Sequence, residues 1–105
     1  MSDTRVTLAE QAAAITALAR TAEEHPELPG AYFVLSWVTP GQVDVLVPTY
    51  AGFEAWRVAL DVPTAEVVPG NCASERHHLE FLTAVAGVAV RAYVMGYPVA
   101  DGGAA

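Results

Sequence analysis

The chain has 105 residues, of which 53% are hydrophobic and 16% are charged, and its formal net charge is −7. This length suits one domain with its own core, so we expect a single domain over 1–105 with frayed ends at 1–6 and 98–105. The apolar content excludes a disordered chain, and no apolar run reaches the roughly 18 residues of a membrane-spanning helix. The negative charge works against binding to nucleic acid or to an anionic membrane. The single cysteine, Cys72, excludes an internal disulfide and indicates a cytoplasmic protein.

A capping box marks the start of the first predicted helix, because Thr7 precedes Glu10 by three residues. His25-Pro26 ends this helix, since proline disfavours helical geometry in the residue before it. Between these ends, apolar residues recur at helical spacing and predict one buried stripe. The stripe consists of Leu8, Ala12, Ile15, Ala19 and Ala22, with Leu18 beside them.

Two segments rich in β-branched and aromatic residues, 31–38 and 43–47, flank Pro40-Gly41 and predict a hairpin. If these two residues form the loop, Val34 faces Val47 across the hairpin. One face of the hairpin then carries Phe33, Leu35, Trp37, Asp44 and Leu46. Neither face is cleanly polar, so a strand slip or a bulge that turns Leu35 and Trp37 into the core and Ser36 outward stays open as the alternative.

A second helix is expected over 52–60, with Thr49 as its cap and Phe53, Trp56 and Leu60 on one side. A short edge strand over 66–68 follows. The final hairpin is the clearest strand signal, because alternating segments 77–85 and 88–97 flank Ala86-Gly87. One face of it is apolar, with Leu79, Phe81, Thr83, Val85, Val88, Val90, Ala92 and Val94; the other carries Arg76, His78, Glu80, Leu82, Arg91, Tyr93, Met95 and Tyr97.

These elements predict an α+β fold of order αββα(β)ββ, in which two helices pack on one face of a four- to five-stranded, mainly antiparallel sheet. Two helices cover only one side of such a sheet, and large exposed apolar patches commonly mark interaction sites. We therefore expect a non-enzymatic interaction module that self-associates, as a homodimer, or binds a protein through the open sheet face. The expected partner-binding residues are Phe33, Leu35, Trp37, Leu46, Tyr93, Met95 and Tyr97, and the expected polar rim consists of Asp44, His78, Glu80 and Arg91.

Catalysis and metal binding are not expected, and no cofactor is implied. Cys72, His77 and His78 are close in sequence, but their spacing matches no usual zinc ligand pair. Adjacent residues of a strand point to opposite faces, so the two histidines do not easily hold one ion together. His78 and Glu80 share a face, which suits an acid–base pair, but a solvated cross-strand cluster explains the pattern more simply. No nucleophile, base and orienting group can be assembled into a catalytic set.

Two other functions stay open. One is a small-molecule-binding or enzymatic dimer whose pocket lies between two facing sheets and is lined by His78, Glu80, Arg91 and Tyr93. The other is an acidic decoy, of the kind that phages use, which imitates nucleic acid and binds a host defence protein. The charge of −7 permits the decoy, although the acids show no phosphate-like spacing.

The sequence also carries signs of origin. All five basic residues are arginines and the chain has no lysine, which is typical of a GC-rich bacterial or phage genome. The chain resembles small α+β proteins of unknown function from actinobacteria and actinophages. The resemblance rests on Phe53-Glu54-Ala55-Trp56-Arg57, His78-Leu79-Glu80, Ala86-Gly87-Val88-Ala89-Val90 and the helix that ends in Glu-His-Pro-Glu-Leu-Pro. It implies a cytoplasmic accessory protein derived from a phage or mobile element, and no catalytic residue or cofactor.

Overall fold

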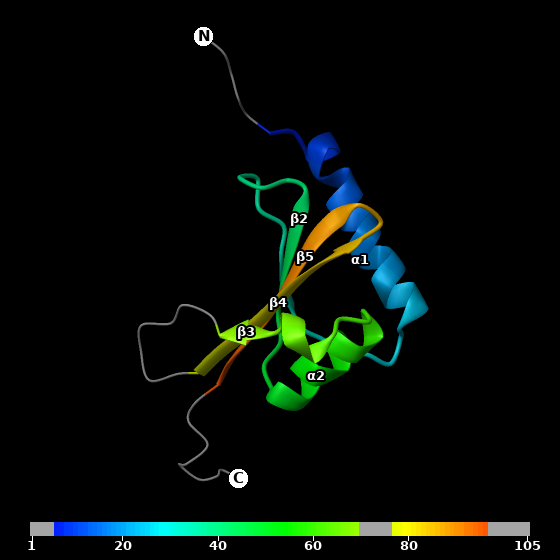
Figure 1. Ribbon diagram of the computed structural model, residues 1–105. Coiled ribbons are helices and arrows are strands. Elements are labelled where there is room, and N and C mark those ends of the chain that lie inside the picture. Colours follow the sequence, from blue (N-terminus) through cyan, green and yellow to red (C-terminus); the bar gives the residue numbers. More distant parts are fainter. Residues whose placement is uncertain (1–5, 70–76, 97–105) are drawn as a thin grey trace.

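The computed structural model describes residues 6–69 and 77–96, with only the backbone of His77, Met95 and Gly96. Figure 1 shows the order of the elements along the chain. The helices are α1 (Ala12–Glu24), which follows a 3-10 turn at Leu8–Gln11, and α2 (Tyr50–Ala59). The strands are β1 (Tyr32–Val34), β2 (Gln42–Leu46), β3 (Val68–Pro69), β4 (His77–Val85) and β5 (Val88–Gly96), and a second 3-10 turn spans Thr64–Glu66.

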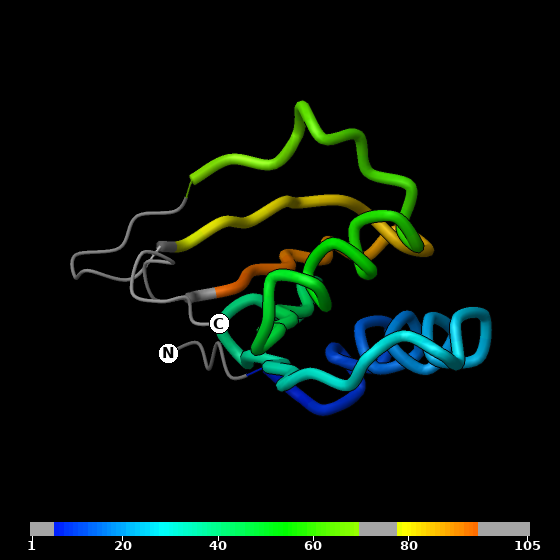
Figure 2. Tube along the Cα trace, turned by 90° about the horizontal axis from the view of Figure 1, so that it is seen from below, coloured from blue at the N-terminus to red at the C-terminus, as the bar shows by residue number. Residues whose placement is uncertain are grey.

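The five strands form one sheet in the order β1-β2-β5-β4-β3. All neighbours are antiparallel except β2 and β5, which run parallel. A parallel pair needs a crossover connection, and here the chain leaves β2, passes through α2, β3 and β4, and returns as β5 beside β2. Both helices lie on the same side of the sheet, as the turned view shows (Figure 2). The predicted α+β fold with two helices on one face is therefore confirmed.

The core lies between this side of the sheet and the two helices. Its largest fully buried side chain is Phe81 of β4, whose ring centroid lies 5.3 Å from that of Phe53 in α2. The β4–β5 hairpin has the predicted turn and register, with Val85 opposite Val88. Its apolar face supplies Phe81, Val88, Val90, Ala92 and Val94 to the core, which confirms the predicted alternation.

The face of α1 that packs against the sheet is not the predicted apolar stripe. Its buried residues are Ala14, Ala17 and Thr21, whereas Leu8 and Ile15 of the predicted stripe are exposed. The predicted caps are correct: Thr7 and Glu10 form the capping box, and the helix ends at Glu24 before His25-Pro26. Alanines occupy so many positions that apolar spacing alone does not define the contact face. The small side chains of Ala14 and Ala17 allow the helix backbone to approach the sheet closely.

α2 is held to the end of β2 by short-range contacts. Thr49 caps the helix by accepting a hydrogen bond from the Gly52 amide at 3.0 Å, as predicted. Trp56 is buried, and its indole Nε1 donates to the carbonyl of Pro29 at 3.0 Å. This bond ties α2 to the connection between α1 and β1.

No helix within 6–69 and 77–96 has the length and apolar character needed to cross a membrane.

The first hairpin is paired in a different register from the predicted one. Val34 pairs with Asp44 and not with Val47, a shift of three positions. An odd shift exchanges the two faces of a strand. The strands end at Val34 and begin again at Gln42, so a connection over 35–41 replaces the predicted two-residue loop. The exchange of faces changes the composition of the open side of the sheet.

Candidate functional site on the open sheet face

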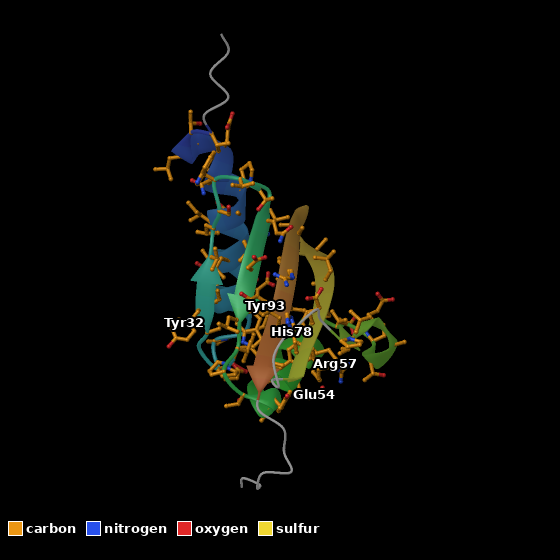
Figure 3. The ribbon with its side chains drawn as sticks, turned by 90° about the vertical axis from the view of Figure 1, so that its left-hand side faces the viewer. Tyr32, Glu54, Arg57, His78 and Tyr93 are labelled. Atoms are coloured by element: carbon orange, nitrogen blue, oxygen red, sulfur yellow. The ribbon has the colours of Figure 1, made fainter. Side chains whose placement is uncertain are left out.

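We use "open face" for the side of the sheet opposite α1 and α2, which Figure 3 views with the helices behind the strands. Strand register places its residues in cross-strand rows. One row contains Tyr32, Leu46, Tyr93, Glu80 and Val68, and the next contains Val34, Asp44, Arg91 and Leu82. Each row joins apolar side chains at the sides to polar ones near the centre. No described element packs over these rows, because both helices lie on the other side of the sheet.

A polar cluster occupies the centre of the open face, on β2, β5 and β4. Arg91 donates through Nη2 to the Glu80 carboxylate at 3.1 Å, and its Nη1 lies 3.7 Å from Asp44 Oδ2. Gln42 adds a hydrogen bond from its amide to Asp44 at 2.7 Å. The relative exposure of the Arg91, Glu80 and Asp44 side chains is between 24% and 31%, so these ion pairs are partly removed from water. Arg91 therefore offsets part of the negative charge on both neighbouring strands.

Tyr93 is the aromatic centre of the cluster. The Arg91 guanidinium lies over its ring at 4.5 Å from the centroid, and the His78 ring stacks on it with centroids 5.4 Å apart. Cation–π contact and stacking hold both polar groups close to the sheet surface. Only 8% of the His78 side chain is exposed, and its Nε2 lies 3.2 Å from Glu80 Oε1 without hydrogen-bond geometry.

The structure brings all four predicted rim residues together. Asp44, His78, Glu80 and Arg91 all lie on the open face, but they form its centre and not its rim. Leu46 and Tyr93 also lie on the open face, as predicted. Register places Met95 opposite His78. Tyr97 and Arg76 lie outside the described residues, as do Cys72, the expected loop at 70–76 and most of the expected frayed ends.

Of the predicted partner-binding residues, Phe33 and Leu35 do not lie on the open face, and Trp37 lies outside the strands. Phe33 pairs with Val45 and points to the helix side, where its ring lies 6.1 Å from that of Trp56. Leu35 packs against the core, and its carbonyl accepts a hydrogen bond from Gln11 at 3.0 Å. Trp37 lies in the connection after β1 and is 66% exposed. The alternative with a slipped strand is therefore correct for Leu35 and wrong for Trp37.

Sequence reasoning missed the β1 residues that do lie on the open face. Tyr32 and Val34 take the places assigned to Phe33 and Leu35, because the register shift exchanged the faces. Tyr32 is 69% exposed, and Val34 is also exposed. Val68 of β3 lies opposite Glu80 and was likewise missed. The period-two pattern of 31–38 is apolar on both faces, so no local signal distinguishes the two orientations.

Exposed apolar side chains concentrate on β1 and the connection that follows it. Tyr32, Phe33, Val34, Trp37 and Val38 are all exposed large hydrophobic residues within one short segment. This segment lies inside an uncharged stretch, residues 28–43, which contains no Asp, Glu, Lys, Arg or His. Contiguous exposed apolar surface is unusual on a monomer. We call residues 32–38 the β1 segment.

An apolar cavity of about 180 Å³ opens on the other side of the sheet, where α1 ends. Leu18 and Ala22 of α1, Leu28, Phe33 and Trp56 contribute to its walls, and His25 stands beside them. Thr21 also lines the cavity, but its hydroxyl already donates to the Ala17 carbonyl at 2.9 Å. Trp56 Nε1 likewise already donates a hydrogen bond to the Pro29 carbonyl. The cavity therefore offers little polar chemistry with which to orient a ligand.

Within the described part of the chain, no group of three or more His, Cys, Asp or Glu side chains is arranged to hold a metal ion. Comparisons with protein-family models, with curated proteins and with solved structures find no match to this chain. The open face and the β1 segment are therefore the surfaces whose chemistry indicates a function.

Proposed function

We propose that the protein is a non-enzymatic interaction module that self-associates through the β1 side of its open face. The observation that carries the proposal is the exposure of Tyr32, which lies opposite Leu46, and of Val34, which lies opposite Asp44; both belong to the β1 segment. Aromatic residues are enriched at protein interfaces and charged residues are depleted from their centres. The uncharged stretch 28–43 meets both conditions.

Charge favours this location for contact between two copies. Each copy carries a formal charge of −7, so most approaches bring carboxylates together. On the open face, Arg91 compensates one of the two charges of Asp44 and Glu80. On the β1 segment there is no charge to compensate. A second copy can therefore approach this side of the sheet with the least electrostatic cost.

Sedimentation equilibrium and native mass spectrometry test the proposal. We expect wild-type protein at micromolar concentration to have twice the chain mass of 11.0 kDa. Tyr32→Asp places a carboxylate in the contact of both copies and is expected to give a monomer with an unchanged circular dichroism spectrum. Val58→Asp is the matched control, because Val58 is similarly exposed on α2, on the other side of the sheet. A monomeric wild type would contradict the proposal.

One observation favours a second candidate function, the binding of a small polar molecule at the polar cluster. His78 Nε2 is buried without a hydrogen-bond partner, although Glu80 Oε1 lies close to it. Such a buried polar atom is costly, and a ligand that bonds to it would relieve the cost. A mass excess in native spectra that disappears in His78→Phe would support this candidate, and wild-type spectra without any excess would count against it.

A further inference from the structure

β1 is one of the two edges of the sheet, and the two edges differ in their protection. β3, at the far edge, has two residues and ends in Pro69, which has no N–H to donate. β1 borders β2 on one side only, and in Figure 3 it forms the outer margin of the sheet, beside the labelled Tyr32. An edge strand directs N–H and C=O groups of alternate residues away from its sheet. The β1 edge therefore offers backbone hydrogen bonds to another strand.

Natural proteins usually protect such an edge with charge, proline or a bulge. No residue between Leu28 and Val43 is charged, and the nearest following proline, Pro40, stands beyond the strand. The side chains on both faces of β1 are also exposed and apolar, since Tyr32 and Val34 point to the open face and Phe33 to the helix side. Charge and proline are thus absent from β1 itself, and apolar side chains are exposed on both of its faces; its length of three residues is a protection that it shares with β3.

We infer that β1 pairs antiparallel with β1 of a second copy, so that two five-stranded sheets join into one continuous sheet. The inference rests on the proposed self-association and names its geometry. Antiparallel pairing of a strand with its own copy follows a two-fold axis, the commonest symmetry of homodimers. The pairing brings the Tyr32 and Val34 side chains of one copy beside those of the other, where cross-strand contacts stabilise the pair.

Self-complementarity of the strand edge favours a second copy as the occupant, and the absence of charge on β1 leaves the edge open to it. An acidic chain of −7 would attract a basic partner, but the β1 edge carries no carboxylate to receive one. Two copies that each carry −7 repel one another overall, and this repulsion is weakest where the surfaces in contact are uncharged, as they are at the β1 edge. The hydrogen-bonding pattern of a strand edge is also complementary to itself in the antiparallel direction.

Amide hydrogen exchange of the full chain, compared above and below the dimer dissociation constant, tests the pairing directly. Edge pairing protects outward N–H groups within 32–34, because they become hydrogen-bonded across the interface. Stacking of two open faces would cover side chains but leave these amides without partners. We expect slower exchange at 32–34 in the dimer, and no change at 88–94, where β5 already lies between two strands.

Matched charge variants supply an independent measurement. Val34→Lys and Leu82→Lys introduce the same charge at exposed open-face positions, one on β1 and one on β4. We expect Val34→Lys to raise the dimer dissociation constant by about tenfold or more, because the ammonium group of each copy, opposite Asp44, loses water at the paired edge. Leu82→Lys should change it by less than about twofold, since its position lies outside an edge-paired interface.

The outcomes separate this inference from the proposed function. A dimer that is weakened by Leu82→Lys, or whose 32–34 amides exchange at the monomer rate, would overturn edge pairing and leave self-association intact. A wild-type monomer at all concentrations would overturn both. Slowed exchange at 32–34 together with selective loss of the dimer in Val34→Lys supports the continuous sheet.

Discussion

Arg91 reaches diagonally across the β4–β5 hairpin and donates through Nη2 to the carboxylate of Glu80 at 3.1 Å. The same guanidinium lies 3.7 Å from Asp44 on the opposite neighbouring strand. One cation on β5 thus holds two partly buried carboxylates, one on each neighbouring strand. Because β2 is distant in sequence from the β4–β5 hairpin, this contact ties two separate parts of the chain together in the middle of the sheet.

Replacement of Arg91 by methionine should destabilise the fold. Arg91→Met keeps the aliphatic volume but leaves Asp44 and Glu80 without their counterion, and we expect a loss of about 1–2 kcal/mol in the free energy of unfolding at neutral pH. Urea denaturation measures the loss. Arg20→Met, at an exposed position of α1, is the control and should change little. Addition of Glu80→Gln to Arg91→Met should restore part of the stability, and an additive double mutant would contradict the pairing.

Gly52 stands where α2 comes closest to the end of β2. A Cβ at this position would lie 2.7 Å from Val47 Cγ1 and 3.2 Å from Thr49 Oγ1. Gly52→Ala should therefore lower the free energy of unfolding by about 1–3 kcal/mol, although alanine is the better helix former. Gly30→Ala is the matched control, because no atom lies within 4 Å of the added Cβ. Equal stability of the two variants in urea would show that Val47 yields without cost.

The turn between β4 and β5 places a residue with a Cβ in left-handed backbone geometry. Ala86 has φ of 53° and Gly87 has φ of 80°, the signs that a type I′ turn requires. Asparagine tolerates this region better than alanine, so Ala86→Asn should raise the free energy of unfolding by about 0.5–1 kcal/mol. Ala84→Asn, an exposed strand position, should show no such gain. Equal thermal midpoints for Ala86→Asn and the wild type would refute the expectation.

Glu54 and Arg57 form an ion pair on α2, with a hydrogen bond from Arg57 Nε to Glu54 Oε1 at 3.0 Å. This bond, more than the accompanying charge attraction, holds the pKa of Glu54 below its usual value of 4.5, although desolvation opposes the shift. A lowered pKa means that the folded state favours the ionised carboxylate. The pair therefore stabilises the fold above pH 4.5, and its contribution is lost as the pH falls through the lowered pKa.

The measurement is the thermal midpoint of the wild type and Glu54→Gln between pH 7 and pH 3. We expect the wild type to be more stable at pH 7 and the two curves to converge at the acid end. Glu27→Gln, an exposed glutamate in the turn after α1, is the control and should follow the wild type throughout. Arg57 also donates to the Val62 carbonyl at 2.6 Å, and this bond persists in Glu54→Gln. A difference that stays constant with pH would assign the effect to something other than ionisation.

Local signals explain which parts of the candidate site were predictable. A two-residue turn at Ala86-Gly87 fixes the register of its hairpin, so the sequence already groups His78, Glu80, Arg91 and Tyr93 on one face. Asp44 joins them only because β2 lies parallel beside β5, a pairing between segments that are distant in the chain. Such non-local pairing leaves no periodic trace in either segment.

The sequence by itself determined the elements whose ends and faces depend on near neighbours: the Thr7 and Thr49 caps, the stop at His25-Pro26 and the β4–β5 hairpin. Only the tertiary structure decided which face of α1 meets the sheet and which face of β1 is open. Alanines of α1 lie on several of its faces, and β1 has apolar residues on both of its faces. Local patterns therefore do not indicate which face of either element is buried. Packing against Trp56 places Phe33 on the helix side and leaves Tyr32 exposed, because contact energy between distant elements selects one register among several that the local sequence permits.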